Sequence, residues 1–191
     1  MGGALEWLSE FVRWFAEFFP HWKVVISTQG AVKFKSFRLT DPFAGGLEVE
    51  VCGPGFVIYW PVVTDITIYP TARQANDLRA QTLVTKDDRT ITVSAMIVYE
   101  IHDLEAIVAH TYDPEQTIKD IAVTAVHEAC CKRTWGELVE QQRRSTLDTA
   151  LKNEAQKQLK DYGVLVLKVA LTDLAPCRVF RLMQSQGKDE Q

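Results

Sequence analysis

The spacing of the apolar residues changes once along this chain, and that change restricts the fold more than any single motif does. Between residues 23 and 101, short β-branched segments alternate with turn signals, which is typical of antiparallel strands. Beyond Asp113 the apolar residues recur every three or four positions, as on amphipathic helices, until Gly163 opens a last apolar run. Strands, then helices, then one strand predict an α+β fold.

Strand-like segments lie at residues 23–28, 31–37, 47–52, 56–61, 64–70 and 90–101. Gln29-Gly30 predicts a hairpin turn between the first two strands. The Gly53-Pro54-Gly55 turn directs the fourth strand, because glycine reaches backbone angles closed to other residues. The polar run TKDD at residues 85–88 predicts a hairpin tip whose Asp side chains accept bonds from backbone amides.

Two helices are predicted in the second half. Asp113 is an N-cap followed by Pro114 at the first helical position. The apolar face of this first helix is predicted to consist of Ile118, Ile121, Ala122, Ala125, Val126, Ala129 and Cys130. Thr134 and Glu137 form a capping box, which predicts a second helix over residues 135–162 with a left-handed C-cap at Gly163.

Residues 3–22, GALEWLSEFVRWFAEFFPHW, form an acidic and aromatic segment with helical periodicity. Its polar residues make one narrow stripe, and large apolar residues cover the rest until Pro20 ends the helix. A charge at every third or fourth position makes crossing a bilayer costly, and the segment lacks the basic start and cleavage site of a signal peptide. A helix lying in an interface is therefore predicted.

That interface is either the boundary between lipid headgroups and acyl chains or a contact with protein. The Trp residues at 7, 14 and 22 favour the headgroup level, whereas the acidic stripe argues against reliance on anionic lipid. The residues predicted to contact the membrane are Leu5, Trp7, Leu8, Phe11, Val12, Trp14, Phe15, Phe18, Phe19 and Trp22.

Composition excludes several classes of function. A net charge of −4 with no long basic run argues against nucleic acid as a partner. The four cysteines show no CxxC pair, so neither a disulfide framework nor structural zinc is predicted, and a reducing compartment fits. No glycine loop precedes a helix in the manner of phosphate-binding sites, and no cofactor is expected.

His127 and Cys130, three residues apart on the first helix, could in principle share a metal ion or act as nucleophile and base. Cys130 belongs to the apolar face, however, and a buried cysteine behaves as a small hydrophobic residue. No third ligand has compatible spacing, and no nucleophile elbow is present. The prediction is therefore a protein without a metal site, without catalytic residues and without enzymatic activity.

Taken in order, the motifs resemble the SPFH or band 7 domain of stomatin, prohibitin and flotillin. The matching features are the GPG turn at residues 53–55 and its strand ending at Pro61, the TKD turn at 85–87, Arg133 before the cap at Thr134, and the G-V-x-V strand beginning at Gly163. The resemblance covers roughly residues 23–175.

The resemblance implies a scaffold that is held at a membrane by its N-terminal segment, assembles side by side into rings or cages, and often restrains membrane proteases or channels. The family's long coiled-coil helix is not found after the last strand, so a flat ring, a short assembly or an adaptor joining a larger homologue is expected. The lateral contact is predicted on the second helix, through Arg143, Arg144, Lys152 and Glu154.

We therefore expect a membrane or interface helix at residues 1–22, an SPFH-like domain at 23–175 and a short tail at 176–191. The expected function is that of a membrane-associated scaffold facing a reducing cytoplasmic compartment, with lipid, further copies of itself and membrane proteins as partners. The alternative is a soluble adaptor whose N-terminal helix binds a partner protein or a larger homologue.

Overall fold

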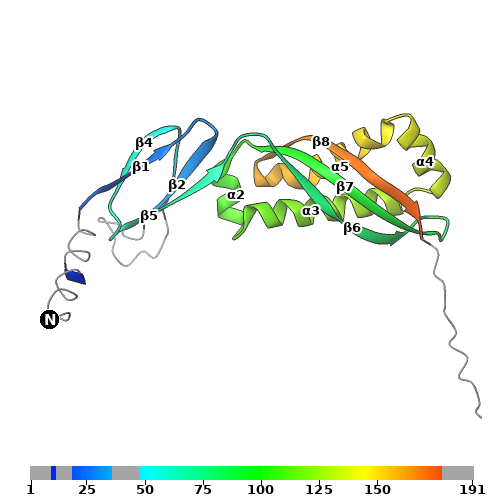
Figure 1. Cartoon of the computed structure of the whole chain (residues 1–191), viewed down its shortest axis with the longest axis horizontal. Helices are drawn as coiled ribbons and strands as arrows, with labels where there is room; N and C mark the ends of the chain where they lie inside the picture. The colour runs from blue at the N-terminus through cyan, green and yellow to red at the C-terminus, as the bar shows by residue number, and fades with distance from the viewer. Residues whose placement is uncertain (1–9, 12–18, 36–47, 178–191) are drawn as a thin grey trace, which may run out of the picture.

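The computed structural model describes residues 10–11, 19–35 and 48–177. Its elements form two lobes along an elongated molecule (Figure 1). The small lobe contains β1 (His21–Val25), β2 (Gln29–Lys35), β3 (Glu48–Cys52), β4 (Gly55–Tyr59) and β5 (Thr64–Pro70). β1 and β4 form an antiparallel ribbon, whereas β2 lies between β3 and β5 in a separate sheet. Apolar side chains are buried where the ribbon packs on that sheet: Val25, Ala31, Val57 and Ile66.

The hairpin predicted at Gln29-Gly30 is wrong. The chain turns earlier, where the Gln29 amide donates to the Ile26 carbonyl at 3.0 Å, and β1 and β2 then pair with different strands. Gly30 is buried within β2. Leu104 packs directly on it, and a Cβ at this position would lie 2.2 Å from Leu104 Cδ1. The glycine therefore permits close packing between the lobes and does not form a turn.

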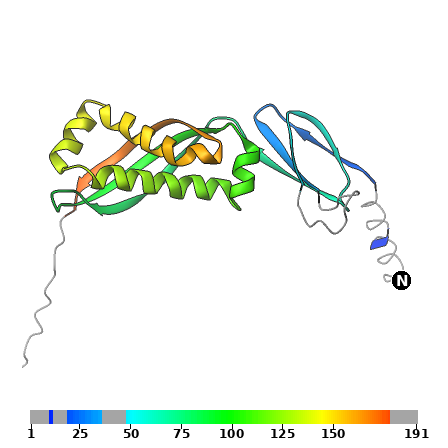
Figure 2. The same ribbon diagram turned by 180° about the vertical axis from the view of Figure 1, so that it is seen from behind.

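The large lobe contains an antiparallel sheet of β6 (Gln74–Val84), β7 (Thr90–Ile101) and β8 (Val164–Pro176), with β7 in the centre. The helices α3 (Pro114–Cys131) and α5 (Thr146–Leu159) lie on the same face of this sheet (Figure 2). Every second side chain of β7, from Ile91 to Ile101, is buried beneath them. The predicted apolar face of α3 is confirmed, with Ile121 half-buried and its other members buried.

The helix α2 (Leu104–His110) was not predicted, although its N-cap, Asp103, is a residue type that favours this position. Asp103 Oδ1 accepts bonds from the amides of Glu105 and Ala106. The first residue of α2, Leu104, is the one that packs on Gly30. This short helix thus belongs to the large lobe and packs against the small one.

The single helix predicted over residues 135–162 is divided into α4 (Trp135–Arg143), α5 and the 3₁₀ turn η1 (Lys160–Tyr162). Leu138 and Leu147 are nine residues apart, so on one continuous helix they would face directions about 180° apart. Both are fully buried. The break at Ser145, whose φ is +55°, turns both side chains toward the core. The capping box at Thr134 and Glu137 is confirmed.

The left-handed cap predicted at Gly163 is confirmed, with a φ of +69°. Its carbonyl accepts bonds from the amides of His102 and Asp103, each at 3.0 Å, and so ties the start of β8 to the end of β7. Beside it, the Gln156 side chain bonds to the outer edge of β8. Its Nε2 donates to the Val164 carbonyl at 3.0 Å, and its Oε1 accepts from the Val166 amide at 2.7 Å.

The TKDD tip between β6 and β7 is attached to the start of α4. Asp87 Oδ1 accepts from the Thr85 hydroxyl at 2.6 Å and from the Trp135 amide at 3.0 Å. The tip Asp thus accepts from a backbone amide, but that amide belongs to the start of α4 and not to the tip itself. Arg89 Nε lies 3.2 Å from Asp87 Oδ2. The hairpin tip therefore holds the corner between α3 and α4 through Asp87 and through the Lys86 amide, which donates to the Arg133 carbonyl at 3.0 Å.

We expect Asp87→Ala to reduce stability at neutral pH and to have less effect in acid. The Thr85 hydroxyl, and then the Trp135 amide, hold the pKa of Asp87 below its ordinary value. A lowered folded-state pKa means that this contribution is present above about pH 4 and is lost as the pH falls through the folded-state value. Urea unfolding at pH 7 and at about pH 3 measures the difference.

Asp88→Asn is the matched control, because Asp88 lies at the same tip with a φ of +58° that asparagine tolerates. The control should unfold like the natural chain at both pH values. A destabilisation by Asp87→Ala that is the same at both pH values would contradict the assignment.

Candidate membrane-facing surface

The β1–β4 ribbon has apolar side chains on both of its faces. Directly paired residues in an antiparallel ribbon share a face, and Trp22 pairs with Ile58 as Val24 pairs with Phe56. These four side chains point away from the small sheet. We call this surface the ribbon face and define it as Trp22, Val24, Phe56 and Ile58.

The ribbon face is strongly exposed. Phe56 is 79% exposed, Trp22 74%, Ile58 65% and Val24 55%. Ile26 and Trp60 continue the two strands just beyond their ends, and both are also exposed. Single exposed apolar residues are ordinary on protein surfaces, but a contiguous group of large apolar residues marks a surface that contacts a membrane or another protein.

The opposite face of the ribbon explains why these residues point outward. Val25 and Val57 are buried against the small sheet. Lys23 Nζ donates to the Ile66 carbonyl at 3.0 Å and lies 5.5 Å from the centre of the Tyr59 ring. Lys23, the one charged residue of β1, thus interacts with the small lobe itself. None of the four side chains of the ribbon face is polar.

The positions of the predicted membrane residues can be compared with this surface. Phe11, Phe19 and Trp22 are described and exposed. The others, Leu5, Trp7, Leu8, Val12, Trp14, Phe15 and Phe18, lie outside the described residues. Trp22 belongs to β1. The domain boundary expected after residue 22 stays a prediction. Among the described residues, no helix is both long and apolar enough to span a membrane.

Sequence reasoning did not identify Val24, Phe56 and Ile58 as surface residues. The signal was present, because KVVI and FVIYW lack the polar residue at every second position that a half-exposed strand normally carries. Such a run predicts a strand covered on both faces. The partner strand and the outward face cannot be read from that run, since β4 pairs with β1 across two intervening strands.

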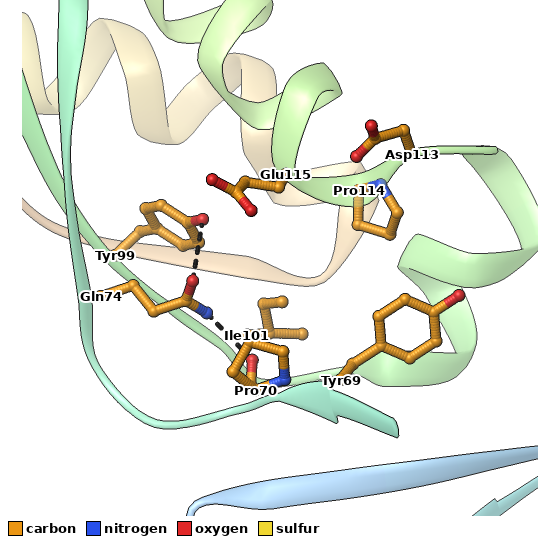
Figure 3. Close-up of a pocket in the computed structure, with 8 residues that line it drawn as sticks. All are labelled: Tyr69, Pro70, Gln74, Tyr99, Ile101, Asp113, Pro114 and Glu115. Carbon is orange, nitrogen blue, oxygen red and sulfur yellow. Dashed lines mark hydrogen bonds between the residues drawn. The ribbon is translucent and has the colours of Figure 1, made fainter. Parts of the chain in front are cut away.

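A small pocket of about 160 Å³ lies between the end of β5, the start of β6 and the N-terminus of α3 (Figure 3). On its floor the Tyr99 hydroxyl donates to Gln74 Oε1 at 3.3 Å and accepts from Asn76 Nδ2 at 3.1 Å. Gln74 Nε2 in turn donates to the Pro70 carbonyl at 2.9 Å. The polar groups of the floor satisfy one another across the junction of the lobes.

The electrostatics of this pocket favour a structural role. Burial, and then the nearby Glu115 carboxylate, raises the pKa of Tyr99 to about 12, so its hydroxyl stays protonated at neutral pH. Burial and Asp113 also raise the pKa of Tyr69 at the rim. Neither tyrosine is suited to act as a base near pH 7.

The Cys130 considered with His127 in the sequence is fully buried, and burial raises the pKa of its thiol to about 11. His127 is instead next to Cys131, whose Sγ lies 3.7 Å from His127 Nε2. Cys130 is buried and His127 is exposed, so the structure does not bring these two side chains together. The two side chains that meet are four residues apart; His127 is exposed, whereas Cys131 is half-buried against the core.

The predicted subunit-contact residues lie around α4 and α5. Arg144 pairs with Glu140 one turn earlier, and Glu154 Oε1 lies 3.7 Å from Lys132 Nζ. Arg143 and Lys152 have no ion-pair partner within the described part of the chain. Two of the four charges are thus already paired within one chain, and the lateral contact stays a prediction.

The model of the SPFH domain / Band 7 family matches residues 24–191 of this sequence. The chain belongs to the SPFH/Band 7 family. It is 25% identical over 167 residues to Stomatin-2 of Caenorhabditis elegans, covering 87% of this chain and 42% of that protein. It is 24% identical over 169 residues to an uncharacterised protein of Archaeoglobus fulgidus, covering 87% and 67%. The identity to Band 7 protein CG42540 of Drosophila melanogaster is 22% over 171 residues, covering 89% and 32%.

This SPFH chain spans less than half the length of the nematode and fly proteins. The matched region begins at Val24, so it contains both strands of the ribbon apart from the first three residues of β1. Three of the four residues of the ribbon face, Val24, Phe56 and Ile58, accordingly lie within the matched region, whereas Trp22 and the predicted N-terminal helix precede it.

Proposed function

We propose that this SPFH chain is a non-enzymatic, membrane-associated scaffold whose small lobe rests on the bilayer through the ribbon face. The observation that carries the proposal is the ribbon face, four large apolar side chains on a two-stranded ribbon with more than half of each exposed. Burying such a side chain contributes about 1.5–3 kcal/mol. Four of them supply enough affinity for a lasting attachment.

The tryptophan residues at the end of the ribbon favour lipid over a protein partner. Trp22 lies at one end of the ribbon, and Trp60 just beyond β4; indole rings prefer the level of the lipid headgroups. Phe19, also exposed, directly precedes Pro20 and the ribbon. The predicted N-terminal helix would enter the membrane surface next to the ribbon face, so both elements would contact one bilayer.

Family membership supports the wider scaffold function, which is part of the same proposal. The chain would associate laterally with further copies, or with a larger SPFH protein, through α4 and α5, and Arg143 and Lys152 are the charges available for that contact. The four cysteines are all free thiols, which suits the proposed position on the cytoplasmic side of a membrane.

Flotation of the purified full-length chain with vesicles tests the proposal. We expect the protein to float with neutral phosphatidylcholine vesicles as well as with vesicles that contain anionic lipid, and to remain bound in high salt, because the ribbon face carries no charge. A protein that stays at the bottom of the gradient as a stable monomer would contradict membrane association. Binding restricted to anionic vesicles would contradict the ribbon face as its cause.

A further inference from the structure

The sheet of the large lobe has one face that no helix covers within the described part of the chain. α3 and α5 lie together on the other face, where every second side chain of β7 is buried (Figure 2). The intervening side chains of β7 therefore point to the uncovered side. We call this side the open face and define it as Ala75 and Asp77 of β6, Thr92, Ser94, Met96 and Val98 of β7, and Lys168 and Ala170 of β8.

The open face differs from an ordinary solvent-exposed sheet surface. An antiparallel sheet with one face in water usually carries polar side chains on that face. Here the central residues Met96 and Val98 are apolar, and both are half-buried among their neighbours. The residues beside them on the outer strands, Ala75 and Ala170, are small, so the surface is flat. Such a surface suits face-to-face packing with a second sheet.

The two charged residues of the open face have opposite signs and lie on opposite strands. Asp77 on β6 is paired with Met96, and Lys168 on β8 is paired with Val98. β7 separates the two strands, and neither charge forms a salt bridge with another described residue. Each charge therefore has its complement on the far side of the same surface.

A twofold axis along β7 would bring these charges together between two copies. It places β6 of one copy over β8 of the other, so that Asp77 of each copy faces Lys168 of the other. Along the strands the two positions differ by two residues, about 7 Å, which the long lysine side chain spans. An axis across the strands would instead place β6 over β6 and β8 over β8, and the opposite charges would not meet.

We propose that two copies of this chain pack their open faces together in a parallel dimer with twofold symmetry. The contact is isologous, because the open face is complementary to itself. Both small lobes lie at the same end of the dimer, since the strands of the large lobe run along the molecule (Figure 1). The dimer contact is distinct from the lateral contact proposed on α4 and α5, because α5 lies on the opposite face of the sheet.

The size of the open side of the sheet is sufficient for a specific contact. β7 has 12 residues and is therefore about 40 Å long. Three strands spaced about 4.8 Å apart make the sheet about 14 Å wide. Its flat area is thus about 560 Å² per copy, and the two copies together exceed the roughly 1,000 Å² that a specific interface needs.

Charge reversal tests the dimer. Sedimentation velocity of the full-length chain is measured in a mild non-ionic detergent, so that the ribbon face does not cause association. Asp77→Lys places two lysines opposite each other, and Lys168→Asp places two carboxylates opposite each other. Either variant should raise the dissociation constant of the dimer at least about tenfold. An equal mixture of the two variants should restore the dimer, because every contact again joins a lysine to an aspartate.

Lys157→Asp is the matched control, because it reverses an exposed charge on α5, away from the open face. It should associate like the natural chain, and all variants should keep the same circular dichroism spectrum. The dimer is overturned if the natural chain is a monomer, if either single variant associates like it, or if the mixture fails to restore the dimer. Loss of association only in Arg143→Glu/Lys152→Glu would also overturn the dimer but would support the lateral contact of the proposed scaffold.

Discussion

Gly163→Val is expected to prevent folding or to cost more than about 3 kcal/mol of stability. A Cβ at this position would lie 2.6 Å from both the Cβ and the backbone oxygen of Asp103, and a side chain is strained at a φ of +69°. A β-branched residue adds its own restriction to this conformation. The variant must therefore also weaken the two bonds that the Gly163 carbonyl accepts, and with them the junction of β7, α2 and β8.

Circular dichroism and urea unfolding measure this effect. The matched control is Gly136→Ala in the first turn of α4, where an added Cβ meets nothing within 4 Å. The control should be unchanged or more stable by up to about 1 kcal/mol, because alanine favours helix more than glycine does. If Gly163→Val unfolds within about 1 kcal/mol of the natural chain, the described packing at this cap is wrong.

The double variant Phe56→Asp/Ile58→Asp is expected to release the chain from membranes. Removing two large apolar side chains from the lipid interface removes about 3 kcal/mol or more of transfer free energy. Each 1.4 kcal/mol is a tenfold change in binding, so partition onto vesicles should fall roughly a hundredfold. Both side chains are well exposed, so the folded state should survive with an unchanged circular dichroism spectrum.

Val84→Asp/Leu165→Asp is the matched control, since it makes the same chemical change at two exposed apolar positions of the large lobe. It should float with phosphatidylcholine vesicles like the natural chain. If both variants float equally well, the ribbon face does not attach the protein. If both are released, added negative charge and not the ribbon face is responsible.

The local signals in the sequence predicted most of the large lobe. Asp113-Pro114, the capping box at Thr134 and the glycine at 163 act within a few residues, and the structure confirms each. The long second helix was wrong for a reason that could have been found. Leu138 and Leu147 fit one buried surface only if the helix is interrupted between them, and the serine at the break gives no strong signal.

The small lobe was harder to predict because its pairings are not local. β1 pairs with β4 and β2 with β5, so each pairing skips intervening strands, and an apolar strand does not specify its partner. The local sequence around Gly30 predicts a turn. The true role of Gly30 depends on Leu104, more than seventy residues away in the chain, and on the approach of α2. The ribbon face escaped prediction for the same reason.

The amide that Gln156 presents to β8 also limits how the protein can aggregate. An edge strand with free backbone groups recruits other strands, and β8 is long enough for that hazard to be real. By occupying the Val164 carbonyl and the Val166 amide, Gln156 takes the place that an incoming strand would need. Continuous strand addition along the full length of β8 is thereby obstructed, so copies of the chain at high concentration cannot pair along the whole of β8 to form an extended β-aggregate.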